Sequence, residues 1–194
     1  MYTEYKIARD RAWQTLIDVG VSHLPIRLSA VAKYYGIHIL KYSDIDQEPF
    51  NEDGYSIKFE GKLLIFYNEL KPKHRIRFTI AHELGHCLLG HLKENQATPR
   101  INNETDKYKD PKEIQANVFA RDILMPATVL HSLGVNSPEQ ISKICNVSMQ
   151  SAEIRFKRLL ELNTRNMFNR HPLERQVYNN FIPYIEKVLD TGNI

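Results

Sequence analysis

The chain has 194 residues, is 42% hydrophobic and 25% charged, and carries a formal net charge of +3. This length predicts one domain, or one domain with a small appendage, that can bury a core. The charge is too small to argue for nucleic-acid binding by itself, and no stretch approaches the roughly 18 uninterrupted apolar residues of a membrane span.

The first part of the chain predicts helices followed by strands, from the spacing of its apolar residues. The predicted elements are, in order, a helix over 4–19, a short helix that ends at Gly36, and strands over 37–42, 54–59 and 62–67. Glu60-Gly61 joins the last two strands, which is a hairpin signature. The last strand should be buried because Leu63 to Phe66 is apolar throughout.

The remainder predicts helices and one long polar loop. A helix begins after Pro72 and runs to Leu92, the loop covers 93–110, and helices follow over 111–124, 126–133, 138–145, 148–162 and 173–189. Pro111 suits the first turn of its helix, because its ring presets the helical φ angle. We predict an α+β domain over residues 1–165 and a helical extension over 166–194.

One motif carries candidate chemistry, His82-Glu83-Leu84-Gly85-His86, inside the predicted apolar helix. Residues four apart lie on one helix face, so His82 and His86 can bind one metal ion. Two imidazoles suit Zn²⁺, which activates a water for attack on a peptide carbonyl. Glu83 lies beside a ligand and can act as the general base. The motif predicts a zinc-dependent peptidase; the alternative is a pair of hydrogen-bonded core histidines around a buried carboxylate.

A catalytic zinc site needs a third protein ligand. One common pattern places a histidine six residues after the second ligand, but that position holds Leu92. His91 is one residue short and would lie on a different helix face from His86. We therefore expect His91 to lie at the end of the helix and not to bind the metal. Direct binding of the metal by His91 is the less favoured alternative.

The other common pattern takes a glutamate from a later helix. Glu113 can reach a metal from there, and Asn117, one turn later, can hold the far nitrogen of a ligand histidine. An acidic residue in a first helical turn is also favoured on a solvent-facing surface, so the residues alone leave both interpretations open. Asp122, Glu104 and Asp106 are further candidate ligands.

Several motifs follow one another in a characteristic order. They are Arg77–His86, Leu88–His91, Glu113–Ala120 and Leu124–Pro126, with Gly54–Ser56 and Asn68 upstream and Val147-Ser148, Ala152 and Arg155 downstream. Together they resemble the ImmA/IrrE family of metallopeptidases over residues 25–160, approximately. One departure is Gln115, at a position where many members carry a second glutamate.

The resemblance implies a zincin-like fold, in which a small, mainly antiparallel twisted sheet packs on the active-site helix and further helices follow. It implies that His82, His86 and Glu113 bind Zn²⁺ and that Glu83 is the base. It also implies a protein substrate, a helix-turn-helix transcriptional repressor. The hairpin over 54–67 would pair with the extended substrate as an added strand.

Residues of the second hairpin strand would then contact the substrate, and we name Leu63, Ile65 and Tyr67 for this role. This is a hypothesis about strand addition, which requires an edge strand with unpaired backbone groups.

A second function remains open for the segment from Pro138 to Leu162. Its predicted turn and basic second helix resemble a helix-turn-helix, and residues 143–175 hold seven Lys or Arg against three Glu. The alternative function is a DNA- or partner-binding regulator that uses the zinc domain as a scaffold without hydrolysis. We do not expect direct nucleic-acid binding, because the same pattern occurs in the peptidase domain of the family.

The chain has two cysteines, Cys87 and Cys145, far apart in sequence. This spacing is typical of free thiols in a reducing compartment. No basic head followed by an apolar run marks a signal peptide. We therefore expect a cytoplasmic protein that does not contact a membrane.

Overall fold

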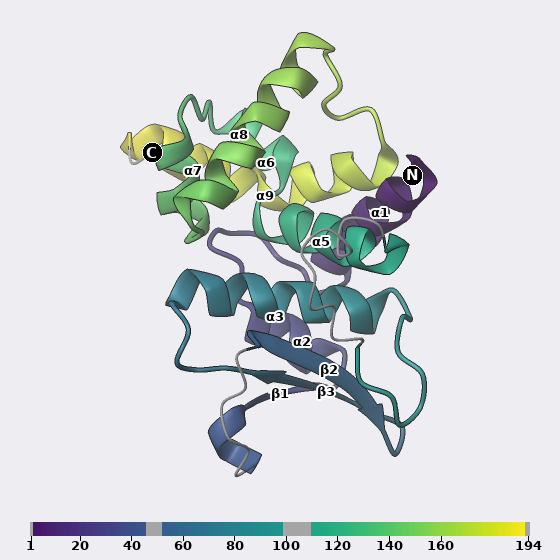
Figure 1. Cartoon of the computed structure of the whole chain (residues 1–194). Helices are drawn as coiled ribbons and strands as arrows, with labels where there is room; N and C mark the ends of the chain where they lie inside the picture. The colour runs from purple at the N-terminus through teal and green to yellow at the C-terminus, as the bar shows by residue number, and fades with distance from the viewer. Residues whose placement is uncertain (1, 46–51, 99–109, 193–194) are drawn as a thin grey trace. The chain divides into compact units, whose positions relative to one another are not determined.

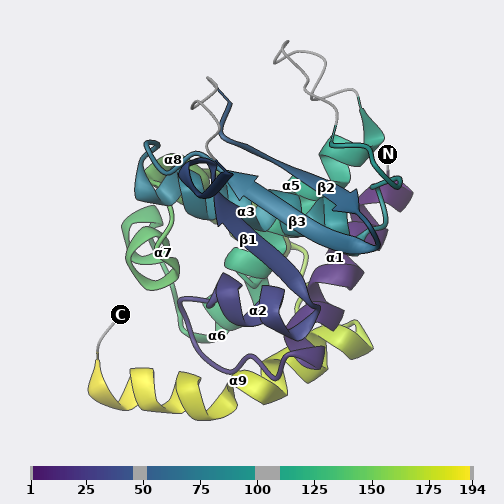
Figure 2. The ribbon, with the colours of Figure 1, turned by 90° about the horizontal axis from the view of Figure 1, so that it is seen from below.

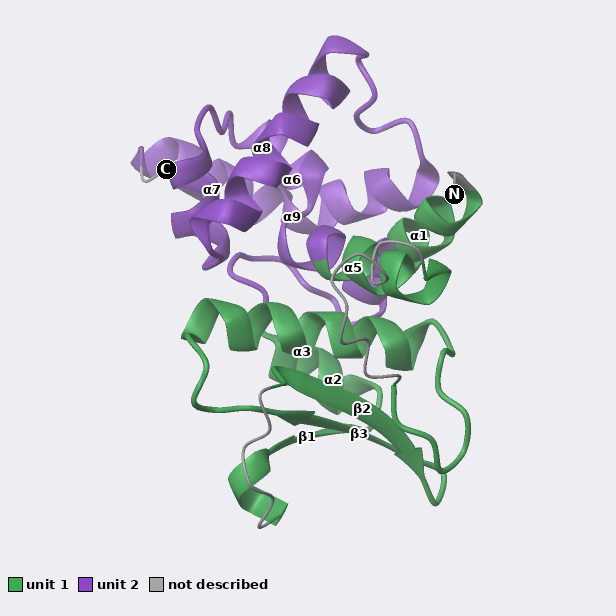
Figure 3. Cartoon of the chain, viewed as in Figure 1, with its two compact units in different colours: residues 1–11, 27–120 green, residues 12–26, 121–194 purple. Residues whose placement is uncertain are grey.

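The structure is a computed structural model that describes residues 2–45, 52–98 and 110–192. It is an α+β protein that divides into two compact units (Figure 3). Unit 1 comprises residues 1–11 and 27–120, and unit 2 comprises residues 12–26 and 121–194. The predicted domain boundary at residue 165 stays a prediction, and the compact units divide the chain at other residues.

Unit 1 contains the sheet and the motif helix. Its elements are α2 (Leu28–Tyr34), β1 (Ile37–Lys41), the 3₁₀ helix η1 (Tyr42–Ile45), β2 (Gly54–Phe59), β3 (Lys62–Tyr67) and α3 (Lys73–Leu88). Two helices have parts in both units, α1 (Tyr2–Asp18) and α5 (Pro111–Leu124). The predicted hairpin strands and the predicted helix over 111–124 are confirmed with the same bounds.

Strand β3 lies in the middle of a three-stranded sheet with the order β1-β3-β2. It pairs in parallel with β1 and antiparallel with β2. The sheet is therefore mixed, and the expected mainly antiparallel arrangement is wrong for the β1 pair. The central position explains why the most apolar strand is β3, since Ile65 is fully buried and Phe66 is 7% exposed.

Helix α3 packs against one face of this sheet, over β2 and β3 (Figure 1, Figure 2). It begins after Pro72, the N-cap residue. Ala81 and residues 83–87 are buried, so the motif lies in the most enclosed part of the helix. Cys87 and Cys145 are both buried, and no disulfide bond joins them, as predicted.

Helix α5 approaches α3 closely at Gly85, which allows the two helices to share a site. A Cβ atom at residue 85 would lie 3.1 Å from the Ala116 Cα atom and 3.3 Å from the Ala116 carbonyl oxygen. Glycine facing alanine therefore brings the two backbones together. Glu113 lies about one turn before Ala116, and Asn117 follows it directly. Both side chains are therefore held next to the motif.

Helix α3 ends at Leu88, four residues before the predicted end. Gly90 has a φ of 72°, a left-handed conformation that ends helices. The Leu89 N–H donates to the Gly85 carbonyl, and the His91 N–H donates to the His86 carbonyl over 3.0 Å. This turn carries His91 back towards His86.

Unit 2 consists of helices. Its complete elements are α6 (Ala127–Ser132), α7 (Pro138–Cys145), α8 (Met149–Thr164) and α9 (Pro172–Thr191). Helices α7 and α8 pack against each other, and Asn146 between them has a φ of 54°. The Ser148 hydroxyl accepts the Ser151 N–H and caps α8. No helix in the described part of the chain is long and apolar enough to cross a membrane.

Helix α8 buries an arginine that the sequence placed on a basic surface. Arg155 is 2% exposed, and its Nη1 lies 2.9 Å from the Asp122 Oδ1. It is therefore not available to contact a phosphate, which weakens the DNA-binding interpretation. Of the apolar residues of α8, Leu159 is buried, while Ile154 is 61% exposed and Leu160 is 52% exposed.

Candidate metal centre

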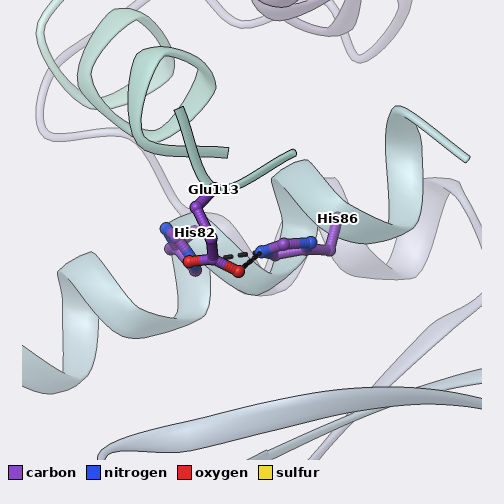
Figure 4. Close-up of side chains that lie close together, drawn as sticks. All are labelled: His82, His86 and Glu113. Carbon is purple, nitrogen blue, oxygen red and sulfur yellow. Dashed lines mark hydrogen bonds and ion pairs between the residues drawn. The ribbon is translucent and has the colours of Figure 1, made fainter. Parts of the chain in front are cut away.

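Two helices of unit 1 bring three candidate ligands together. His82 and His86 project from the same face of α3, and Glu113 reaches them from the first turn of α5 (Figure 4). Each oxygen of Glu113 lies 3.3 Å from the Nε2 atom of one histidine. The two Nε2 atoms lie 3.0 Å apart. One ligand atom from each of the three residues lies within 4.8 Å of the other two.

The donor set of these residues fits a metal ion. The His82 Nδ1 lies 3.0 Å from the Asn117 Oδ1, an acceptor, so Nδ1 carries a proton, and the Nε2 of a neutral ring then has a lone pair for a metal. The His86 Nε2 faces the same point. Two imidazole nitrogens and a carboxylate that meet this closely need a proton or a cation between them, and a bound metal ion would take the place of the proton. Two imidazole nitrogens and one carboxylate are a donor set that Zn²⁺ prefers.

The charges of the centre favour an ionised glutamate. Burial alone would raise the pKa of Glu113, but hydrogen bonds and charge from His82 and His86 outweigh it and hold this pKa well below its usual range. Burial would lower the pKa of His82, but the hydrogen bond to Glu113 and the negative charges of Glu83 and Glu113 raise it. Glu113 is therefore ready to bind a cation without first losing a proton.

Glu83 contacts β2 through Ser56 and is 5% exposed. The Ser56 hydroxyl donates to its Oε2 over 2.7 Å, and the Thr98 hydroxyl donates to the same oxygen over 3.4 Å. Both hydroxyls therefore fix Oε2, and Oε1 is the oxygen that can take a proton. No role was predicted for Ser56 or Thr98; the polar Ser56 lies between the apolar Tyr55 and Ile57, which is a signal that could have identified it.

His91 lies against the centre instead of on another face of the helix. Its Nδ1 lies 3.1 Å from the His86 Nδ1, and its Nε2 lies 2.8 Å from the Gln115 Oε1. Burial lowers the pKa of His91 to about 4. Helical spacing puts residues five apart on different faces, but α3 ends at Leu88, before His91, so this contact does not follow from the helical pattern.

The predicted substrate-binding role of β3 is corrected by the strand order. Leu63, Ile65 and Tyr67 lie on the central strand, which is hydrogen-bonded to a neighbour on each side. It therefore has no free edge to which a substrate strand could add. The outer edge of the sheet beside α3 belongs to β2.

Residues 94–98 already occupy part of the β2 edge. The Asn95 N–H donates to the Lys58 carbonyl over 2.8 Å, and the Thr98 N–H donates to the Ser56 carbonyl over 2.8 Å. A substrate strand that pairs with β2 at these two positions has to displace residues 94–98.

The remaining candidate ligands do not join the centre. Asp122 forms ion pairs with Arg121 and Arg155 in unit 2, so its carboxylate is already used. Glu104 and Asp106 lie outside the described residues.

Comparison with known proteins adds one match. A family model described as Peptidase_M78, IrrE N-terminal-like domain, matches residues 32–157, which is more than half of the chain. The matched range includes the three candidate ligands, Glu83 and the whole sheet. No match is found among curated proteins.

Proposed function

This chain belongs to the ImmA/IrrE family of metallopeptidases, and on that premise we propose that it is a zinc-dependent endopeptidase that cleaves a regulatory protein. The observation that carries the proposal is the convergence of His82, His86 and Glu113 beside the buried carboxylate of Glu83. His82, His86 and Glu113 would hold the metal, and Glu83 would be the base.

The roles of the side chains follow from their contacts. When bound, zinc supplies Lewis acidity, which acidifies a water and polarises a peptide carbonyl. Glu83 takes a proton from the attacking water at Oε1 and returns it to the leaving nitrogen. The Ser56 hydroxyl holds the other oxygen over 2.7 Å, and Ser56 belongs to β2 itself, so the carboxylate keeps its orientation during both transfers. Asn117 holds the ring of His82 from its far side.

The proposed substrate is a helix-turn-helix repressor. The support for this substrate is the resemblance to the family. Its members typically cleave a repressor of this kind that is encoded near the gene of the peptidase. An extended segment of the substrate would pair with β2 after residues 94–98 move aside. We expect the zinc-loaded protein to cut the repressor encoded beside its gene into a small number of fragments, detected by gel electrophoresis and mass spectrometry. An uncleaved repressor after incubation with zinc-loaded protein would contradict this substrate.

The metal site itself is tested by its ligand from α5. Glu113→Gln should weaken zinc binding by more than about 100-fold, since the loss of a mere hydrogen-bond partner of a ligand already costs 10–100-fold. Competition with a chromogenic chelator measures the affinity. Glu161→Gln makes the same change at an exposed carboxylate of α8 and is the control. Equal zinc affinity in Glu113→Gln and the control would show that Glu113 is not a ligand.

A further inference from the structure

Two amide side chains of α5 contact the histidine pair, one directly and one through a third histidine. Asn117 Oδ1 lies 3.0 Å from the Nδ1 of His82. Gln115 Oε1 lies 2.8 Å from the Nε2 of His91, whose Nδ1 lies 3.1 Å from the Nδ1 of His86. Helix α5 thus supplies a candidate ligand, Glu113, and also both amides behind the histidines.

The chemistry of these atoms allows one arrangement of protons. An amide oxygen only accepts, so the His91 Nε2 must carry a hydrogen and donate it to Gln115. In a neutral ring, the His91 Nδ1 is then an acceptor. The His86 Nδ1 must therefore be the donor between the two rings, and the Nε2 of a neutral His86 ring then has a lone pair for a metal. With the opposite tautomer of His91, its Nε2 lone pair would face the Gln115 Oε1, so that two acceptors would meet.

We propose that Gln115 and His91 are positioning residues that set the tautomer of His86 and so present its Nε2 as a metal donor. The consequence for metal binding rests on the proposed zinc site, whereas the tautomers belong to the chain itself. His82 is held in the same way, because its Nδ1 also has a hydrogen-bond partner, the Asn117 Oδ1. Gln115 accepts the hydrogen bond from His91 with a neutral oxygen, whereas a glutamate at this position would add a second negative charge beside Glu113.

The surrounding structure holds His86, His91 and Gln115 in contact. His86 is 1% exposed, so water cannot replace His91 as its partner. The rings of His86 and His91 meet edge to face, with centroids 5.1 Å apart. Lys112 Nζ donates to the His91 carbonyl over 3.3 Å, and the left-handed Gly90 fixes the direction of the chain before it. The position of His91 against His86 is therefore fixed by the backbone as well as by the contacts of the side chains.

The first test reads the tautomers directly. Long-range ¹H–¹⁵N correlation spectra of the metal-free protein should show His91 neutral and protonated at Nε2. The zinc-loaded protein should show the same His91 tautomer, with His86 protonated at Nδ1. A His91 ring protonated at Nδ1 in the metal-free protein would overturn the proposal, whether or not the centre binds zinc. Absence of zinc binding in wild type would instead count against the proposed function.

The second test changes the accepting oxygen. Gln115→Leu removes it, and we expect zinc to bind about 10–100-fold more weakly. Gln115→Glu retains an acceptor and should bind zinc at least as tightly as wild type. Gln150→Leu makes the same change at an exposed position of α8 and should leave the affinity unchanged. The proposal is wrong if Gln115→Leu binds zinc like wild type, or if Gln115→Glu binds as weakly as Gln115→Leu.

Discussion

Glu83→Gln should lower peptide hydrolysis by about 10²–10⁴-fold, the usual contribution of a positioned general base. The amide keeps the size of the side chain and can still accept the Ser56 hydroxyl at its oxygen, but it cannot take a proton from water. Initial rates on the purified repressor, with a discontinuous assay that detects slow turnover, would measure the loss. Zinc affinity should change little, because Glu83 is not among the three converging ligands.

Two comparisons make this result specific. Glu161→Gln should cleave like wild type, because its carboxylate is exposed on α8. Glu113→Gln should lose activity together with zinc, whereas Glu83→Gln should lose activity and keep zinc. Full cleavage by zinc-loaded Glu83→Gln would refute the role of Glu83 as base and would favour a binding function for the same domain.

Asp122→Asn should destabilise the protein by about 3–5 kcal/mol, the usual cost of removing one partner of a buried ion pair. Asp122 is 4% exposed and Arg155 is 2% exposed, so the remaining guanidinium cannot reach water. The Arg155 Nε has no hydrogen-bond partner among the described residues, which makes its bond to Asp122 more important. Urea unfolding followed by circular dichroism would measure the change.

Glu161→Gln is the matched control, since it breaks the exposed pair of Glu161 with Arg158 on the same helix as Arg155. Exposed pairs contribute at most about 1 kcal/mol. The double variant Asp122→Leu, Arg155→Met should recover much of the lost stability, because it removes both buried charges. A loss for Asp122→Asn no larger than that of the control would contradict the importance of this pair.

The same pair predicts the sign of the pH dependence. Burial would raise the pKa of Asp122, but the charges of Arg121 and Arg155 outweigh it and hold this pKa below its usual range. A lowered folded pKa stabilises the native state at pH values above the unfolded pKa, which is about 4. This contribution is lost as the pH falls through the folded pKa. Asp122→Asn should therefore reduce the loss of stability on acidification. Burial lowers the pKa of Arg155 to about 10, so the arginine stays charged across this range.

The sequence by itself determined the elements of the fold and the three converging residues. Apolar spacing located β2, β3 and α5, because the period of burial differs between strands and helices. The four-residue spacing of His82 and His86 placed both imidazoles on one helix face for the same reason. The order of motifs then singled out Glu113, which local patterns left open.

Only the tertiary structure decided which strand is central and what lies behind the ligands. The position of β3 between its neighbours depends on long-range pairing, which no local pattern specifies. His91 reaches His86 because a left-handed Gly90 reverses the chain, so helical spacing no longer applies to it. Arg155 and Asp122 form a buried ion pair inside unit 2, although charged residues are usually exposed. In all three cases the deciding interaction joins residues across a turn or between elements, beyond the reach of a periodic pattern.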